Sequence, residues 1–167
     1  MHQPGSFRRA ASNDWHRIWP VFSEVVASGD TYMFPPDISE ADARAAWLLV
    51  DQQRAATFCA EIDGQVVGTA IVKPNATGLG DHVANGAWMV SASARGRGVG
   101  RRFAEYVIDH ARAAGYMGMQ FNAVVSTNAN AIALWKSLGF SIVGTVPGAF
   151  RHAVHGRVPI HIMYREL

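Results

Sequence analysis

Arg95-Gly96-Arg97-Gly98-Val99-Gly100 is the stretch of this sequence that decides the fold. It follows an apolar run over residues 85–90 and precedes a segment of helical spacing that ends near Ala114. Glycines let a backbone approach a ligand closely, and the start of a helix exposes unpaired N–H groups at the positive end of its dipole. The sequence therefore predicts a strand, a glycine loop and a helix that together bind a pyrophosphate.

The glycines alone do not identify that ligand. No Gly-Lys-Ser/Thr follows them, so the loop is not a P-loop, and their spacing differs from the Gly-x-Gly-x-x-Gly of a dinucleotide fold. A plain tight turn would explain the same glycines. Neighbouring elements have to distinguish a binding loop from a turn.

Periodicity and turn residues predict a mixed α/β domain. Asp63-Gly64 is a hairpin signal, Ser39 and Asp42 resemble a capping box, and Pro20 requires a bend or a break in the first helix. Helices are expected over 14–26, 39–50, from the glycine loop to about 114, and 130–138. Strands are expected over 6–9, 57–62, 65–72, 85–90, 119–125, 142–146 and 158–165.

Composition favours a single globular domain over residues 1–167, with 49% hydrophobic and 17% charged residues. The net charge is +2 with no basic run, so no nucleic-acid role is indicated. Cys59 is the only cysteine and lies in an apolar run, which argues against a disulfide or a Cys-rich metal site. No signal segment or membrane-spanning stretch is evident, and a cytoplasmic setting is expected.

The glycine loop resembles the Arg/Gln-x-x-Gly-x-Gly/Ala loop of the GNAT acetyltransferases, which wraps the pyrophosphate of acetyl-CoA. A second segment is similar to the family's Asn-x-x-Ala-x-x-Leu-Tyr-x-x-x-Gly-Phe helix. It contains Asn128, Asn130, Ala131, Leu134, Trp135, Leu138, Gly139 and Phe140. The resemblance covers residues 57–167. It implies a GNAT fold, with a mixed central sheet of about seven strands splayed at the cofactor site and flanked by about four helices.

The resemblance also implies an N-acetyltransferase, with acetyl-CoA as the co-substrate and an amine that attacks the thioester directly. Backbone N–H groups of Val90 and Met89 would polarise the acetyl carbonyl, and pantetheine would lie along residues 88–90. Asn128 would bond to the pantetheine arm. The residues expected to bind acetyl-CoA are Trp88, Met89, Val90, Arg95, Gly96, Arg97, Gly98, Val99, Gly100, Arg101, Asn128 and Trp135.

Trp135 departs from the family pattern, because many relatives have a Tyr there that is thought to protonate the departing thiolate. Indole offers only a hydrogen bond. Asn128 or a water is therefore the expected partner of the thiolate, and simple packing under the cofactor is the other interpretation of Trp135.

Two asparagines in predicted strands, Asn85 and Asn122, indicate specific hydrogen bonds, because Asn is disfavoured in strands. A satisfied buried amide or a strand-end cap would explain them equally. The segment over 121–128 is similar to yeast acetyltransferases that act on proline analogues such as azetidine-2-carboxylate. In that group the matching asparagines hold the substrate and its reacting nitrogen, which implies a substrate-binding role for both residues and a catalytic one for Asn85.

The acceptor end of the site is less specified by the sequence. Tyr32 and Phe34 would wall the acceptor pocket, unless they are core aromatics. The base that takes the amine proton is left open between Glu61, His152, His155 and a chain of waters.

Three other functions remain open at this point. These are acetylation of a protein N-terminus or lysine, a catalytically silent acyl-CoA-binding module, and a nucleotide-binding regulator, the last weakened by the absent P-loop. Trp135 keeps the silent module in consideration. The expected partner is a small-molecule amine, without nucleic acid, membrane or metal, and a homodimer is an expectation from the family.

Overall fold

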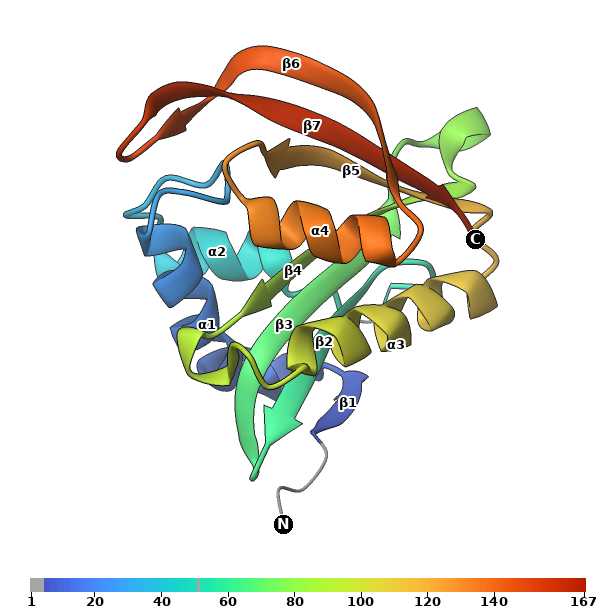
Figure 1. The fold of residues 1–167 in the computed structure, drawn as a ribbon. Coiled ribbons are helices and arrows are strands. Elements are labelled where there is room, and N and C mark those ends of the chain that lie inside the picture. Colours follow the sequence, from blue (N-terminus) through green and yellow to red (C-terminus); the bar gives the residue numbers. More distant parts are fainter. Residues whose placement is uncertain (1–4, 51) are drawn as a thin grey trace.

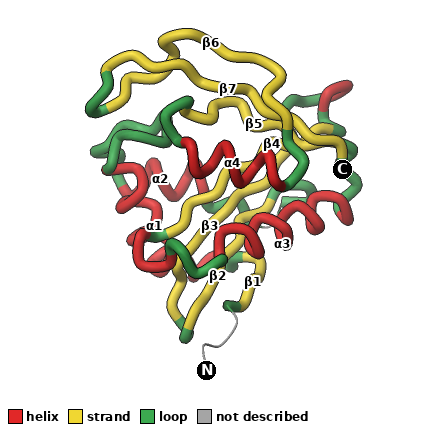
Figure 2. Tube along the Cα trace, viewed as in Figure 1, coloured by secondary structure: helices red, strands yellow, loops and turns green. Residues whose placement is uncertain are grey.

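The fold is built on one seven-stranded sheet with helices on both faces (Figures 1 and 2). The computed structural model describes residues 5–50 and 52–167. Its strands are β1 (Ser6–Arg9), β2 (Ala56–Ile62), β3 (Gln65–Pro74), β4 (Val83–Val90), β5 (Gly118–Val125), β6 (Ser141–His152) and β7 (Gly156–Glu166). Its α-helices are α1 (Trp15–Ala27), α2 (Glu40–Trp47), α3 (Val99–Ala113) and α4 (Ala129–Ser137). The predicted mixed sheet with four helices is confirmed.

The strand order is β1-β2-β3-β4-β5-β7-β6, and only β4 and β5 are parallel to one another. A parallel connection needs a crossover, which α3 provides. The two strands pair only over residues 83–85 and 118–120. Beyond these residues they diverge (Figure 1), so the second half of β4 has an open edge on the β5 side. This is the splayed sheet that the family resemblance implies.

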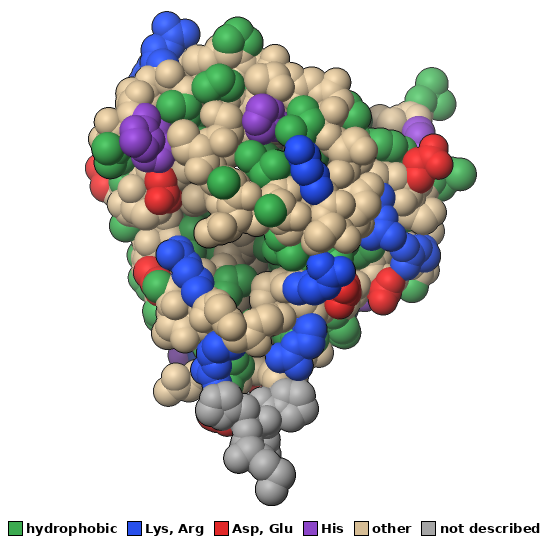
Figure 3. All heavy atoms as spheres, in the orientation of Figure 1, with side chains coloured by type: hydrophobic (Ala, Val, Ile, Leu, Met, Phe, Trp, Pro, Cys, Tyr) green, Lys and Arg blue, Asp and Glu red, His purple; other side chains and the backbone are tan. Residues whose placement is uncertain are grey.

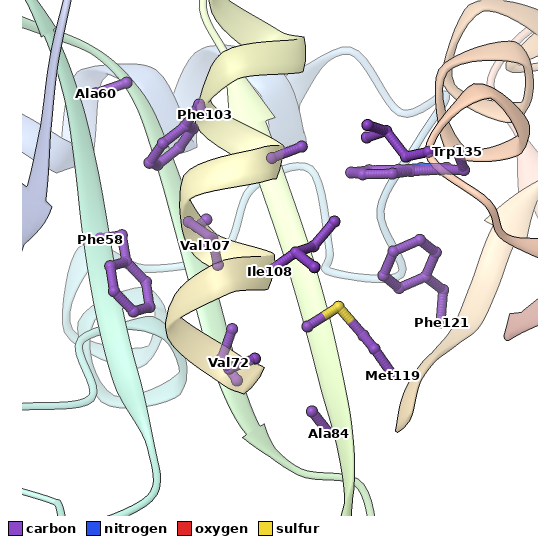
Figure 4. Close-up of a cluster of buried hydrophobic side chains, with 14 of the residues drawn as sticks. Phe58, Ala60, Val72, Ala84, Phe103, Val107, Ile108, Met119, Phe121 and Trp135 are labelled. Carbon is purple, nitrogen blue, oxygen red and sulfur yellow. The ribbon is translucent and has the colours of Figure 1, made fainter. Parts of the chain in front are cut away.

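Two hydrophobic clusters hold the helices on the sheet. One joins α3 and α4 to one face and includes Phe103 and Trp135 (Figure 4). The other joins α1 and α2 to the opposite face and includes Phe22. Successive side chains of a strand point to opposite faces, which explains why Phe58 packs in the first cluster and Cys59 in the second.

Several local signals place their elements correctly. The Ser39 hydroxyl accepts a hydrogen bond from the Asp42 N–H at the start of α2, and Asp63-Gly64 forms the turn between β2 and β3. Of the bend or break expected at Pro20, the break is not found, and Pro20 lies on the exposed side of a continuous α1. Buried residues on both sides of Pro20 pack on the sheet and keep the two halves in one helix.

The last two strands are longer than predicted. β6 and β7 have 12 and 11 residues, and the segment left between the predicted strands, residues 147–157, is reduced to a turn of residues 153–155. β6 is an edge strand with mostly exposed side chains, so its sequence lacks the apolar alternation that reveals a strand. His152 therefore ends a strand instead of lying within a long loop.

Candidate active site

A cavity of about 1430 Å³ opens where β4 and β5 diverge. In Figure 3 the molecule is hollowed between α4 and the loop that precedes α3. The walls come from α4, β5, the glycine loop, the second half of β4, the loop between α1 and α2, and the turn between β6 and β7. Residues from both faces of the sheet line the cavity, so it has a side toward α3 and α4 and a side toward α1 and α2.

The N–H groups of β4 alternate between its two neighbouring strands. The Ser91 N–H donates to the Val67 carbonyl at 2.8 Å, which places the odd-numbered residues of β4 in the hydrogen-bonded pairs with β3. Met89, opposite Thr69, thus belongs to that ladder. The N–H of Val90 points away from β3, into the split between β4 and β5. The Met89 N–H is therefore used by β3 and cannot polarise the acetyl carbonyl, which corrects the prediction for Met89. The Val90 N–H faces the open edge of β4, and its predicted role stays a prediction.

The glycine loop presents backbone to the cavity. Gly96 and Gly98 have φ values of 73° and 70°, and a Cβ at either would meet nothing within 4 Å. Only glycine adopts this left-handed conformation without strain. No side chain caps the start of α3, and the N–H of Arg102 is the first to bond back, to Gly98 at 3.4 Å. The N–H groups before it are therefore free for an anion.

The arginines of this region divide into two groups. Arg95 lines the cavity with the glycines, but Arg97 and Arg101 do not. Arg101 donates to the Ser137 hydroxyl at 2.8 Å and pairs with Glu105 at 3.1 Å, so it ties α3 to α4. The two helices that bound the cavity are held together by this contact.

The α4 wall contains both residues predicted to meet the thiolate. Asn128 caps α4, with its side-chain oxygen accepting the Ala131 N–H at 3.2 Å, and its amide NH₂ has no hydrogen-bond partner among residues 5–50 and 52–167. Trp135 packs against Trp88 and Phe121 with ring centroids 4.9 and 4.6 Å apart. This aromatic cluster supports the packing interpretation of Trp135.

Tyr32 and Phe34 lie on the side toward α1 and α2. The Tyr32 hydroxyl donates to the Trp88 carbonyl at 2.5 Å, and burial raises the pKa of this phenol. The two rings stack with centroids 6.4 Å apart and pack with the buried Trp47. Both aromatics line the cavity and also pack against the cluster of α1 and α2, so core packing does not exclude their predicted place in the acceptor pocket.

Asn85 and Asn122 line the cavity near the point where the strands separate. The Asn85 amide donates to the Gln120 carbonyl at 3.1 Å, across the last paired residues of β4 and β5. Asn122 lies in an irregular part of β5, accepts from the Gln120 side chain at 2.9 Å and donates to Asn75 at 2.8 Å. Each amide thus has a protein partner within reach of the cavity.

Of the candidates for the base, Glu61 is excluded by its position. It lies outside the cavity and pairs with Arg8 at 2.6 Å and Arg17 at 3.0 Å. His152 and His155 do line the cavity, at the turn between β6 and β7.

Burial raises the pKa of the Cys59 thiol to about 12, in agreement with an inert cysteine.

Sequence reasoning missed three charged residues of the cavity, Glu24, Asp30 and Lys73. They come from α1, the loop after it, and β3. No local motif marks them, because the topology alone brings them together. Glu24 accepts the Ala92 N–H at 2.8 Å and the Ser91 hydroxyl at 3.0 Å, and so fixes the chain directly after β4.

The family is decided by a match over most of the chain. A family model described as "Acetyltransferase (GNAT) family" matches residues 15–140. The chain belongs to the GNAT acetyltransferase family. Acetyl-CoA is the co-substrate of this family, so the sequence resemblance is confirmed.

Known relatives of this GNAT chain agree in fold. A GCN5-related N-acetyltransferase from Kribbella flavida is 45% identical, covers 98% of both chains and has a TM-score of 0.93. A phosphinothricin acetyltransferase from Sinorhizobium meliloti, solved in complex with AcCoA, is 22% identical, with 98% and 88% coverage and a TM-score of 0.86. N-acetyltransferase aca1 of Schizosaccharomyces pombe is 36% identical over 90 residues, 54% of this chain and 43% of that relative. The chain spans less than half the length of the curated relatives it matches.

The residues of this GNAT site fit acetyl-CoA. The free N–H groups at the start of α3 suit a pyrophosphate, and open space lies in front of Gly96 and Gly98. Trp88 also lines the cavity, and its buried indole Nε1 has no hydrogen-bond partner among the residues that the structure describes. Within residues 5–50 and 52–167, no group of three or more His, Cys, Asp or Glu could hold a metal. In the same ranges no helix is long and apolar enough to cross a membrane.

Proposed function

We propose that this chain transfers the acetyl group of acetyl-CoA to the amine of a small molecule that resembles an amino acid or a proline analogue. The observation that carries the proposal is the cavity at the split between β4 and β5, which residues from both faces of the sheet line. The neutral amine would attack the acetyl carbonyl, the new C–N bond would form, and CoA would leave as the thiolate. Holding both substrates in one cavity supplies about 7–11 kcal/mol of the barrier in favourable cases.

Acetyl-CoA would bind on the side toward α3 and α4. The glycine loop and the start of α3 would hold the pyrophosphate, and pantetheine would follow the open edge of β4 beside Trp88. The Val90 N–H would stabilise the negative charge that develops on the acetyl oxygen. Its orientation toward the split supports this role.

The acceptor would bind on the side toward α1 and α2, between the aromatic rings and Asn85 and Asn122. The turn between β6 and β7 borders this end and is tied to the loop after α1, because the Ala153 N–H donates to the Gly29 carbonyl at 3.1 Å. A protein N-terminus or a lysine needs an open groove for the chain that follows it. This contact between two loops that border the acceptor end favours a small acceptor over a protein substrate.

Proton transfer in this proposal does not depend on Trp135. The Asn128 NH₂, which has no partner in the described part of the chain, or a water would stabilise the thiolate, and a thiol pKa of about 8.5 lets water protonate it. A water chain in the cavity would take the proton of the amine.

One sheet joins the described strands, which supports a single GNAT domain over residues 1–167.

Acetyl-CoA-dependent thiol release tests the proposal. The acceptors are proline analogues, amino acids, polyamines, aminoglycosides and peptides, and the binding of acetyl-CoA is measured separately by calorimetry. Release with an amino acid or a proline analogue is expected. Release with peptides alone would replace the small acceptor by a protein substrate, and binding without release for any acceptor would favour the silent module.

A further inference from the structure

His152 is held in one tautomer by the turn that it begins. Its Nδ1 accepts the backbone N–H of Val154 at 3.1 Å and that of His155 at 3.2 Å. A ring nitrogen that accepts two N–H groups carries no proton of its own in the neutral imidazole, so the proton is on Nε2. His152 therefore presents a fixed N–H donor and has no free ring lone pair for a general base.

His152 lies at the acceptor end of the cavity. The half-buried side chain lines the cavity, and its Nδ1 is turned toward the backbone of the turn. The Ala153 N–H holds this turn on Gly29 in the loop after α1. Nε2 is consequently the ring nitrogen left for a ligand. The exposed ring of His155 lies beside it, with centroids 4.6 Å apart.

Several donors at this end already bond to the protein, whereas the buried Thr31 hydroxyl has no hydrogen-bond partner among the residues that the structure describes. The Tyr32 hydroxyl donates to Trp88, and the amides of Asn85 and Asn122 donate to Gln120 and Asn75. Lys73, in contrast, lines the cavity and forms no ion pair within the described ranges 5–50 and 52–167. A neutral N–H and an ammonium are thus available in one cavity.

Neither carboxylate of this end, Asp30 or Glu24, forms an ion pair with Lys73 within the described ranges. Asp30 accepts from the Ser28 hydroxyl, and Glu24 accepts from the chain after β4. An ammonium and a fixed N–H without an anionic partner suit a carboxylate, since hydrogen bonds to a charged group are the stronger ones.

We infer that His152 is a specificity-determining residue, whose Nε2–H, together with Lys73, binds a carboxylate of the acceptor. The inference rests on the proposed function and deepens it, because it names the residues that would recognise the carboxylate of such an acceptor. His152 contacts the acceptor at a group that does not react, and so contributes to its binding instead of to proton transfer.

The test compares His152→Asp with His152→Asn in thiol-release kinetics. Both side chains have an oxygen that can accept the N–H groups of the turn, so the hairpin is preserved, but only Asp places a negative charge toward the ligand. L-azetidine-2-carboxylate and azetidine are the two acceptors, which differ only in the carboxylate. His16→Asp is the control, because this exposed residue of α1 lies outside the cavity and gains the same charge.

KM for L-azetidine-2-carboxylate should be about tenfold or more higher in His152→Asp than in His152→Asn. KM for azetidine and for acetyl-CoA should not show this difference, and His16→Asp should resemble the unmodified chain. Equal values for the two variants, or a parallel rise for both acceptors, would overturn the inference and leave the proposed function intact. No thiol release from the unmodified chain with any amine would instead overturn the proposed function, and the inference with it.

Discussion

Val90 is the residue on which the proposed chemistry depends, and its proposed role rests on the alternating direction of the N–H groups along β4. The odd-numbered residues of β4 give their N–H groups to β3, and Val90 has the opposite orientation. Met89 and Val90 are adjacent in the sequence, but only one of them has a free N–H at the split. A sequence motif cannot separate them, because the distinction comes from the register with Thr69 and its neighbours.

Replacement of Val90 by Pro is predicted to remove the polarising N–H without breaking the sheet. Pro lacks the N–H, but this group is outside the β3–β4 ladder. We expect kcat to fall by about 10²–10³ while acetyl-CoA still binds. Thiol-release kinetics and calorimetry measure the two quantities.

Met89→Pro is the matched control for this prediction. It removes a hydrogen bond from the interior of the ladder, and we expect it to unfold the chain or to lower the melting temperature strongly. An unchanged kcat in folded Val90→Pro would refute the role of the Val90 N–H.

At the scale of elements, Glu24 links α1 to the segment that leads from β4 to the glycine loop. Its two oxygens accept from Ala92 and Ser91, directly after Val90. The contact joins an element that lies on the acceptor side to the loop that is proposed to hold the pyrophosphate. Glu24 is thus a positioning residue for that loop.

Glu24→Gln is predicted to weaken acetyl-CoA binding more than turnover. The amide NH₂ of Gln cannot accept from both groups, so the loop loses one charge-assisted hydrogen bond, and KM for acetyl-CoA should rise about five- to tenfold. kcat at saturating acetyl-CoA should stay near its original value. Glu166→Gln, at an exposed position of β7, should change neither constant. An unaltered KM in Glu24→Gln would contradict the positioning role.

Elements with strong local chemistry could be predicted from the sequence. The cap at Ser39, the turn at Asp63-Gly64 and the glycine loop all reside in a few consecutive residues. β6 was underestimated because its exposed side chains carry no alternation, and its pairing with β7 is interrupted by register shifts. Tertiary packing also kept α1 continuous through Pro20, which local rules do not anticipate.

At the scale of the molecule, the candidate site is an assembly of distant segments. The glycine loop and the end of β4 could be predicted because they follow one another in the chain. Glu24 and Lys73 could not, since they reach the cavity only through the order of the strands and the packing of α1. The contact of Ala153 in the β6–β7 turn with Gly29 likewise joins segments that are remote in the sequence.

A charge network joins the first strand and helix to the rest of the molecule. Arg8 binds both oxygens of the buried Asp14 at 2.7 Å and also pairs with Glu61 of β2. The Arg8 guanidinium holds the pKa of Asp14 well below its usual value of 3.8. The ionised carboxylate therefore stabilises the fold fully above about pH 5, and this contribution is lost as the pH falls below 3.8 toward the lower pKa of the folded state.

Asp14→Asn is accordingly predicted to lower the free energy of unfolding by about 2 kcal/mol at pH 7. The difference from the unmodified chain should shrink as the pH falls below 3.8. Urea denaturation at pH 7 and at successively lower pH measures it. A difference that stays constant down to the lowest pH at which the chain folds would show that the charge of Asp14 does not stabilise the fold.

A crystal structure of the chain with acetyl-CoA tests the central claim most directly. We predict the pyrophosphate at the start of α3, pantetheine along the open edge of β4, and the acetyl carbonyl oxygen within hydrogen-bond distance of the Val90 N–H. The acetyl group would then face the acceptor end between Tyr32 and His152. A thioester bound away from the split between β4 and β5, or an acetyl oxygen directed away from Val90, would contradict the account.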